Sequence, residues 1–77
     1  MVKWHFVSNY LQGELSSSAA EHRVNVFRYH DEWCAEVEKI TDYGWALVND
    51  KTDNSLIELL NWAEEELKFH LSHPEKV

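Results

Sequence analysis

Residues 23–71 read RVNVFRYHDEWCAEVEKITDYGWALVNDKTDNSLIELLNWAEEELKFHL, and the spacing of their apolar side chains changes near Asn49. Before Asn49, apolar and polar residues alternate, which is the period of half-buried strands. After it, apolar residues recur at the spacing of a helix, namely Leu56, Leu60, Ala63, Leu67 and Leu71. This change of period predicts a small α+β domain, with an antiparallel sheet of three to four strands covered on one face by a C-terminal helix.

The expected strands are joined by short polar connections, which favours antiparallel pairing. They lie at residues 2–7, 23–30, 33–40 and 45–48. Residues 8–15 fit a strand, a turn of helix or a packed loop, and Gly13 argues against a long helix there. We expect a mobile loop at Ser16–Ala20 and a turn at Asn49–Lys51 that ends the last strand. Residues 1–77 are long enough for one small domain.

Alternation within the two middle strands predicts which side chains share a face. In residues 23–30, Val24 and Val26 face one way and Phe27 and Tyr29 the other. In residues 33–40, one set of side chains points inward and the other toward solvent. The inward set is Trp33, Ala35 and Val37, and the outward set is Glu36 and Glu38.

The helix has a well-defined start signal in the sequence. Ser55–Glu58 matches a capping box, in which the serine accepts a hydrogen bond from the amide of the glutamate three residues later. Thr52 or Asp53 would cap the helix one turn earlier. We expect the helix to end near Leu71 or Ser72, because Pro74 disfavours helical backbone before it.

The composition indicates a cytoplasmic protein without disulfides. Cys34 is the only cysteine among 77 residues, which suits a reducing compartment. The apolar runs are too short for a secretory leader or a membrane span, so we expect no membrane contact. Four Trp, three Tyr and three Phe supply the large side chains that a core this small needs.

The net charge of −7 is unevenly distributed along the chain. Residues 1–30 carry three basic and two acidic side chains, whereas residues 31–77 carry twelve acids against four lysines. A surface of this sign repels phosphate groups, so direct nucleic-acid binding is disfavoured. The charge favours solubility and a partner protein with a basic surface.

One flank of the predicted helix combines aromatic and acidic residues outside the apolar stripe. It carries Trp62 and Phe69 together with Glu58, Glu65 and Glu66. Because tryptophan is enriched at binding hot spots, these five residues are the predicted partner-binding surface. In the alternative, residues 8–15 fold over this flank and make both aromatics part of the core, or the aromatics are buried in a homodimer.

Two residue pairs have spacings near those of zinc sites, His30 with Cys34 and His70 with His73. No complete zinc, EF-hand or phosphate-binding motif accompanies them. A chain this short also leaves little room for a nucleophile, its base and a substrate cleft. We therefore expect a non-enzymatic protein with no metal and no cofactor, and a small metal-binding protein is the third hypothesis.

These features together favour an acidic inhibitor or adaptor that acts by protein–protein interaction. Compact acidic proteins of this type are common among phage-encoded inhibitors, including anti-CRISPR proteins and DNA mimics, although no motif of this chain identifies such a family. The order of strands and helix resembles antitoxin domains of the HicB kind in topology only. A self-associating, homodimeric module of structural or antitoxin-like type is therefore the alternative.

Overall fold

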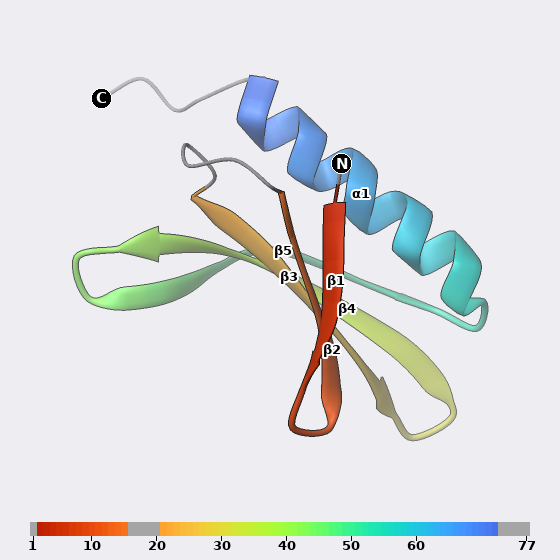
Figure 1. The fold of residues 1–77 in the computed structure, drawn as a ribbon. Helices are drawn as coiled ribbons and strands as arrows, with labels where there is room; N and C mark the ends of the chain where they lie inside the picture. The colour runs from red at the N-terminus through yellow and green to blue at the C-terminus, as the bar shows by residue number, and fades with distance from the viewer. Residues whose placement is uncertain (1, 16–20, 73–77) are drawn as a thin grey trace.

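Six elements follow one another in the computed structural model, which describes residues 2–15 and 21–72 (Figure 1). They are β1 (Val2–Val7), β2 (Tyr10–Leu15), β3 (His22–Tyr29), β4 (Glu32–Thr41), β5 (Gly44–Asp53) and α1 (Leu56–Ser72). The strands form one antiparallel sheet in the order β1-β2-β3-β4-β5. The helix crosses one face of this twisted sheet (Figure 1). The α+β prediction is confirmed, but the sheet has five strands rather than three to four.

The additional strand is β2, formed by the segment that the sequence left open between strand, helix and loop. It pairs with β1 on one side and β3 on the other, and Trp4 lies directly opposite Gly13. A side-chain carbon added to Gly13 would lie 2.5 Å from the indole ring of Trp4. The glycine therefore leaves space for the indole ring above the strand.

The last strand is longer than predicted, and the expected turn at Asn49–Lys51 is wrong. These residues stay in β5, which continues to Asp53. The pairing with β4 shifts at a bulge, because Val37 lies opposite Asn49 whereas Glu38 lies opposite Leu47. Val48 is the extra residue, and it interrupts the alternation of side chains between the two faces from which strands are predicted. As an edge strand with mostly exposed side chains, β5 tolerates the polar residues that resemble a turn.

Two-residue loops connect β1 to β2 and β3 to β4. The first residue of each loop has a positive φ, 59° at Ser8 and 56° at His30, a position that favours glycine in type II′ hairpins. The connection between β4 and β5 is also a short turn that contains a residue with a positive φ. Gly44 has a φ of 111°, and the backbone amide of Tyr43 donates to the Thr41 hydroxyl at 3.1 Å.

The hydrophobic core lies between α1 and the middle of the sheet. Its side chains come mainly from β3, β4 and α1, and the helix packs against β3, β4 and β5. The buried members are Val2, Val24, Val26, Ala35, Val37, Leu59, Ala63 and Leu67. Leu56 and Leu60 pack against them, so the apolar stripe of the helix is confirmed as far as Leu67. The inward positions predicted for Trp33, Ala35 and Val37 are also correct, and Val24 and Val26 share a face as predicted.

The helix begins where the capping box predicts. The Ser55 hydroxyl accepts a hydrogen bond from the Glu58 amide at 3.3 Å, and Asp53 Oδ1 accepts one from the Ser55 amide at 2.8 Å. Ser55 is therefore the N-cap, and Asp53 orients it. The expected loop at residues 16–20, the stop at Pro74 and the side chain of His73 lie outside the described residues.

Candidate functional site

The predicted helix-flank surface divides into two parts. Trp62 is half-buried and packs against the core, and the Lys51 ammonium of β5 lies 5.9 Å from the centroid of its indole ring. Glu66 accepts a hydrogen bond from the Asn49 side chain at 2.7 Å. This part of the flank therefore contacts β5.

The other part of the flank faces solvent. Phe69 is 52% exposed, and Glu58 and Glu65 are exposed as well. Phe69 contacts the ring of His70, which stacks on His22 of β3 with centroids 4.3 Å apart. The five residues thus share one flank of α1, on which Glu58, Glu65 and Phe69 are exposed and Trp62 and Glu66 contact β5. Their role in partner binding stays a prediction.

The face of the sheet opposite α1 carries the other alternating set of side chains, because directly opposite residues share a face. One row crosses all five strands, and each member lies opposite the next. The row runs from β1 to β5 as His5, Gln12, Asn25, Glu36 and Asp50. We call this side of the sheet the uncovered face.

A chain of side-chain hydrogen bonds occupies the β1–β4 part of the uncovered face. His5 donates to Gln12 at 3.2 Å, and Gln12 donates to Asn25 at 3.0 Å. Asn25 and Arg23 both donate to one oxygen of Glu38, at 2.6 and 2.8 Å. The Arg23 guanidinium also lies 4.0 Å from the centroid of the Trp45 ring. These polar side chains therefore satisfy one another by hydrogen bonds within this part of the face.

The adjoining part of the face, over β3, β4 and β5, is acidic and aromatic. Phe27 lies opposite Cys34, Tyr29 opposite Glu32, and Glu36 opposite Asp50. Within the described part of the chain, the carboxylates of Glu32, Glu36 and Asp50 form no ion pair. We call these three carboxylates, together with Phe27 and Tyr29, the acidic–aromatic patch.

Neighbouring cations are engaged elsewhere. The Arg28 guanidinium lies 5.2 Å from the Trp33 ring centroid, and Lys51 approaches Trp62 on the side that α1 covers. Arg23 pairs with Glu38. The patch thus keeps its negative charge although Arg23, Arg28 and Lys51 lie on the same strands.

Cys34, at the centre of the patch, reports this negative charge. Burial raises the pKa of its thiol, and the charges of Glu32, Glu36 and Asp50 raise the pKa further. A raised pKa leaves less thiolate at neutral pH, so the thiol is a weak nucleophile. The arrangement favours recognition of cations over nucleophilic chemistry at Cys34.

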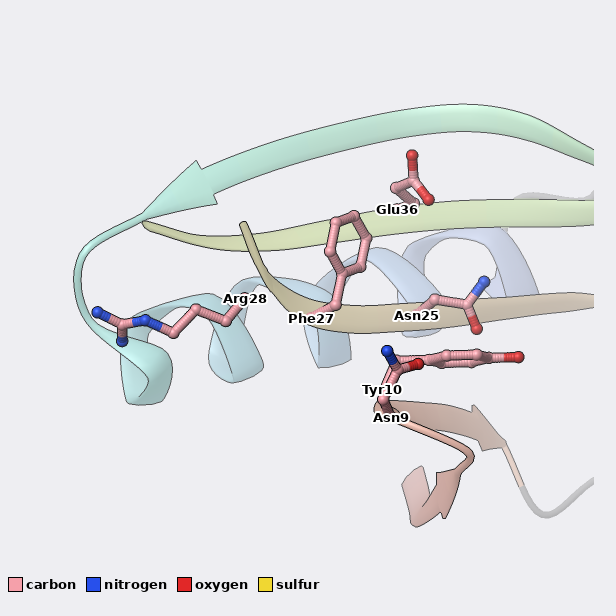
Figure 2. Close-up of a pocket in the computed structure, with 6 residues that line it drawn as sticks. All are labelled: Asn9, Tyr10, Asn25, Phe27, Arg28 and Glu36. Atoms are coloured by element: carbon pink, nitrogen blue, oxygen red, sulfur yellow. The ribbon is translucent and has the colours of Figure 1, made fainter. Parts of the chain in front are cut away.

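Two surface pockets flank Phe27 on the uncovered face. One has a volume of about 380 Å³, and Figure 2 shows Tyr10, Phe27 and Glu36, from three strands, around it. In the same view the side chain of Arg28 points away from the others (Figure 2). The second pocket, of about 280 Å³, lies toward β5 between Phe27, Tyr29, Glu36 and Asp50.

This patch was not predicted from the sequence, although the alternation of side chains in residues 23–30 already indicated it. Alternation already placed Phe27 and Tyr29 opposite the valines that the helix covers. A single helix can cover only one face of a sheet, so these aromatics had to lie on the open side. The contribution of Asp50 was not visible, because it was assigned to a turn.

Of the two pairs with zinc-like spacing, only His30 with Cys34 lies wholly in the described part of the chain, and these two residues do not converge on a metal site. No group of three or more His, Cys, Asp or Glu side chains among residues 2–15 and 21–72 could hold a metal ion. His30 lies in the β3–β4 loop with its ring against Tyr29, whereas Cys34 lies opposite Phe27 on the uncovered face.

Comparisons with protein-family models, curated proteins and solved structures find no match to this chain. The one helix in the described part of the chain, α1, is not long and apolar enough to cross a membrane.

Proposed function

We propose that this protein is a non-enzymatic protein-binding module, an inhibitor or adaptor, that docks through the uncovered face onto a basic surface of a partner protein. The observation that carries the proposal is the acidic–aromatic patch, where three carboxylates have no cationic partner within the described residues. Such a face competes with phosphate groups for a basic surface, as a DNA mimic does.

The energetics of the patch support a partner of positive charge. Glu36 and Asp50 lie directly opposite each other on neighbouring strands, and like charges in that position destabilise a sheet. A cation placed between them removes this repulsion and gains attraction to both carboxylates. Phe27 and Tyr29 add the aromatic area that binding hot spots use.

Binding of a basic probe tests the proposal. A fluorescent hexa-arginine peptide is titrated with the wild-type protein at low salt, followed by anisotropy. The double variant Glu36→Gln with Asp50→Asn should bind about tenfold more weakly, which corresponds to about 1.4 kcal/mol. Added salt should weaken wild-type binding, because exposed charges are screened beyond about 8 Å at physiological ionic strength.

A charge-matched control comes from the helix flank. Glu58→Gln with Glu65→Gln removes the same number of charges from the other predicted surface, so both double variants have equal net charge. We expect this control to bind nearly as well as the wild type. If it binds more weakly than the sheet variant, the helix flank is the docking surface and the uncovered face is not.

A second candidate function is self-association along β5, and it rests on a different observation. The exposed edge strand begins with an uncharged segment, Gly44–Val48, in which Leu47 is 57% exposed. An unprotected edge is a template for pairing with another strand. Light scattering should show a dimer that Leu47→Lys converts to a monomer if this function holds, and a wild-type monomer at high concentration would exclude it.

A further inference from the structure

The pocket beside β5 has the size and the lining of a site for one side chain. Its volume of about 280 Å³ lies just below the range of pockets that hold whole small-molecule ligands, roughly 300–1,000 Å³. Phe27 and Cys34 lie opposite each other within it, Thr52 extends this row onto β5, and Glu36 and Asp50 form the next row. The pocket therefore presents an aromatic surface next to a pair of carboxylates.

We propose that this pocket receives an arginine side chain of the partner, with the guanidinium against Phe27 and its N–H groups directed at Glu36 and Asp50. The inference rests on the proposed function, because it names the anchor by which the basic partner docks. It adds a chemical preference, arginine over lysine, that general charge attraction does not require.

The lining of the pocket distinguishes the two cations. A guanidinium is planar, stacks on aromatic rings and is weakly hydrated, and its fork of donors matches carboxylate oxygens. A lysine ammonium is a compact, strongly hydrated charge that gains less from a ring surface. Tyr29, which is 57% exposed, stands at the edge of the same pocket and can cover the aliphatic part of the bound side chain.

The protein's own cations do not fill this pocket. Lys51 contributes to its lining, but the Lys51 ammonium is directed toward Trp62 on the opposite face. Arg28 lies over Trp33, and Arg23 is bound to Glu38. Arg23 and Arg28 are the two arginines of residues 1–77, so an arginine bound here must come from another molecule.

Two peptides of equal charge test the preference. Hexa-arginine and hexa-lysine are titrated separately into the wild-type protein and into Phe27→Leu, and thermal melting checks that the variant is folded. We expect the wild type to bind hexa-arginine at least about fivefold more tightly than hexa-lysine, which lies within the range of cation–π contacts at exposed sites. Phe27→Leu should lose this preference and keep its affinity for hexa-lysine.

Phe6→Leu is the matched control, because Phe6 is an exposed aromatic residue on the other face of the sheet. It should retain the full preference for arginine. If Phe27→Leu does not fold, Tyr29→Leu takes its place, with a partial loss of preference expected. A preference that survives Phe27→Leu or Tyr29→Leu, or that falls equally in Phe6→Leu, would overturn the inference.

The outcomes separate this inference from the proposed function. If both peptides bind equally and Glu36→Gln with Asp50→Asn weakens both, the docking face is supported and the arginine pocket is wrong. If the same double variant weakens neither peptide, the docking face itself is wrong, and the pocket falls with it.

Discussion

The two faces of the sheet are formed by alternate residues of the same strands, yet one is buried under α1 and the other is open. The face under α1 carries small aliphatic side chains, such as Val24, Val26, Ala35 and Val37, that are almost completely buried. The uncovered face carries hydrogen-bonded polar groups in one part and the acidic–aromatic patch in the other. Folding explains the first face, because only buried apolar surface offsets the entropy cost of ordering the chain.

The two parts of the uncovered face also differ from each other. From His5 to Glu38, each polar side chain has a hydrogen-bond partner, which is what an open sheet face needs in water. Glu36 and Asp50 belong to the same row across the sheet but have no such partner within the described residues. The fold gains nothing from placing these two carboxylates opposite each other. Stability therefore does not explain the residues of the patch, whereas the proposed docking of a basic partner would.

The largest expected effect is a difference in stability between truncating a side chain under α1 and truncating one on the uncovered face. Leu59→Ala removes a fully buried side chain of α1 and should cost about 2–5 kcal/mol, the range for such truncations in cores. Leu47→Ala, on the exposed end of β5, should change stability by less than about 0.5 kcal/mol. Urea denaturation followed by tryptophan fluorescence measures both. Similar losses for the two variants would show that the uncovered side is packed against something in solution.

The next largest loss of stability is expected where β1 pairs with β2 on the covered face. Gly13→Ala places a methyl group where the Trp4 ring lies, so the ring must move, at a cost of about 1–3 kcal/mol. The same substitution in a Trp4→Leu background should be much less costly, because the clash is absent there. Equal costs in the two backgrounds would mean that the two positions do not interact.

A smaller effect of opposite sign is expected on the uncovered face. Asp50→Asn removes the like-charge contact with Glu36 and should raise stability by about 0.2–1 kcal/mol. The matched change is Asp42→Asn, which removes one charge from the β4–β5 turn, and it should have little effect. A loss of stability in Asp50→Asn alone would contradict the repulsion on which the proposed docking face depends.

The thiol of Cys34 gives an independent measure of the same charge. Because burial and then the acids Glu32, Glu36 and Asp50 raise its pKa, alkylation by iodoacetamide should require a higher pH than for a free cysteine. Glu36→Gln with Asp50→Asn should lower this pKa and speed alkylation at a fixed alkaline pH. An unchanged pH profile would show that the two carboxylates exert little field at the centre of the patch.

The sequence was sufficient for most of the covered face. Alternation placed Val24 and Val26 of β3 on one face and identified the inward residues of β4. Helical spacing identified Ala63 and Leu67, and the capping box located Ser55. These signals are local and repeat several times, so single exceptions do not hide them. The bulge at Val48 is one exception without a local signal, because register depends on the strand that pairs with it.

The candidate site was less predictable, for a physical reason. A helix flank can be judged from one segment, and Trp62 stood out there, but its contact with Lys51 depends on the position of β5. The acidic–aromatic patch combines residues from three strands, and its charge depends on where Arg28 and Lys51 point. Charge balance on a sheet face is a tertiary property, so no local pattern of the sequence contains it.

The most direct test of the central claim is to locate a bound cation on the protein. Amide chemical shifts of the wild-type protein, assigned by NMR, are followed as hexa-arginine is added at low salt. We predict that the largest shifts cluster at residues 27–29, 32–36 and 50–52, and that they vanish in Glu36→Gln with Asp50→Asn. Shifts concentrated on residues 58–69 of α1, with the sheet unaffected, would contradict it.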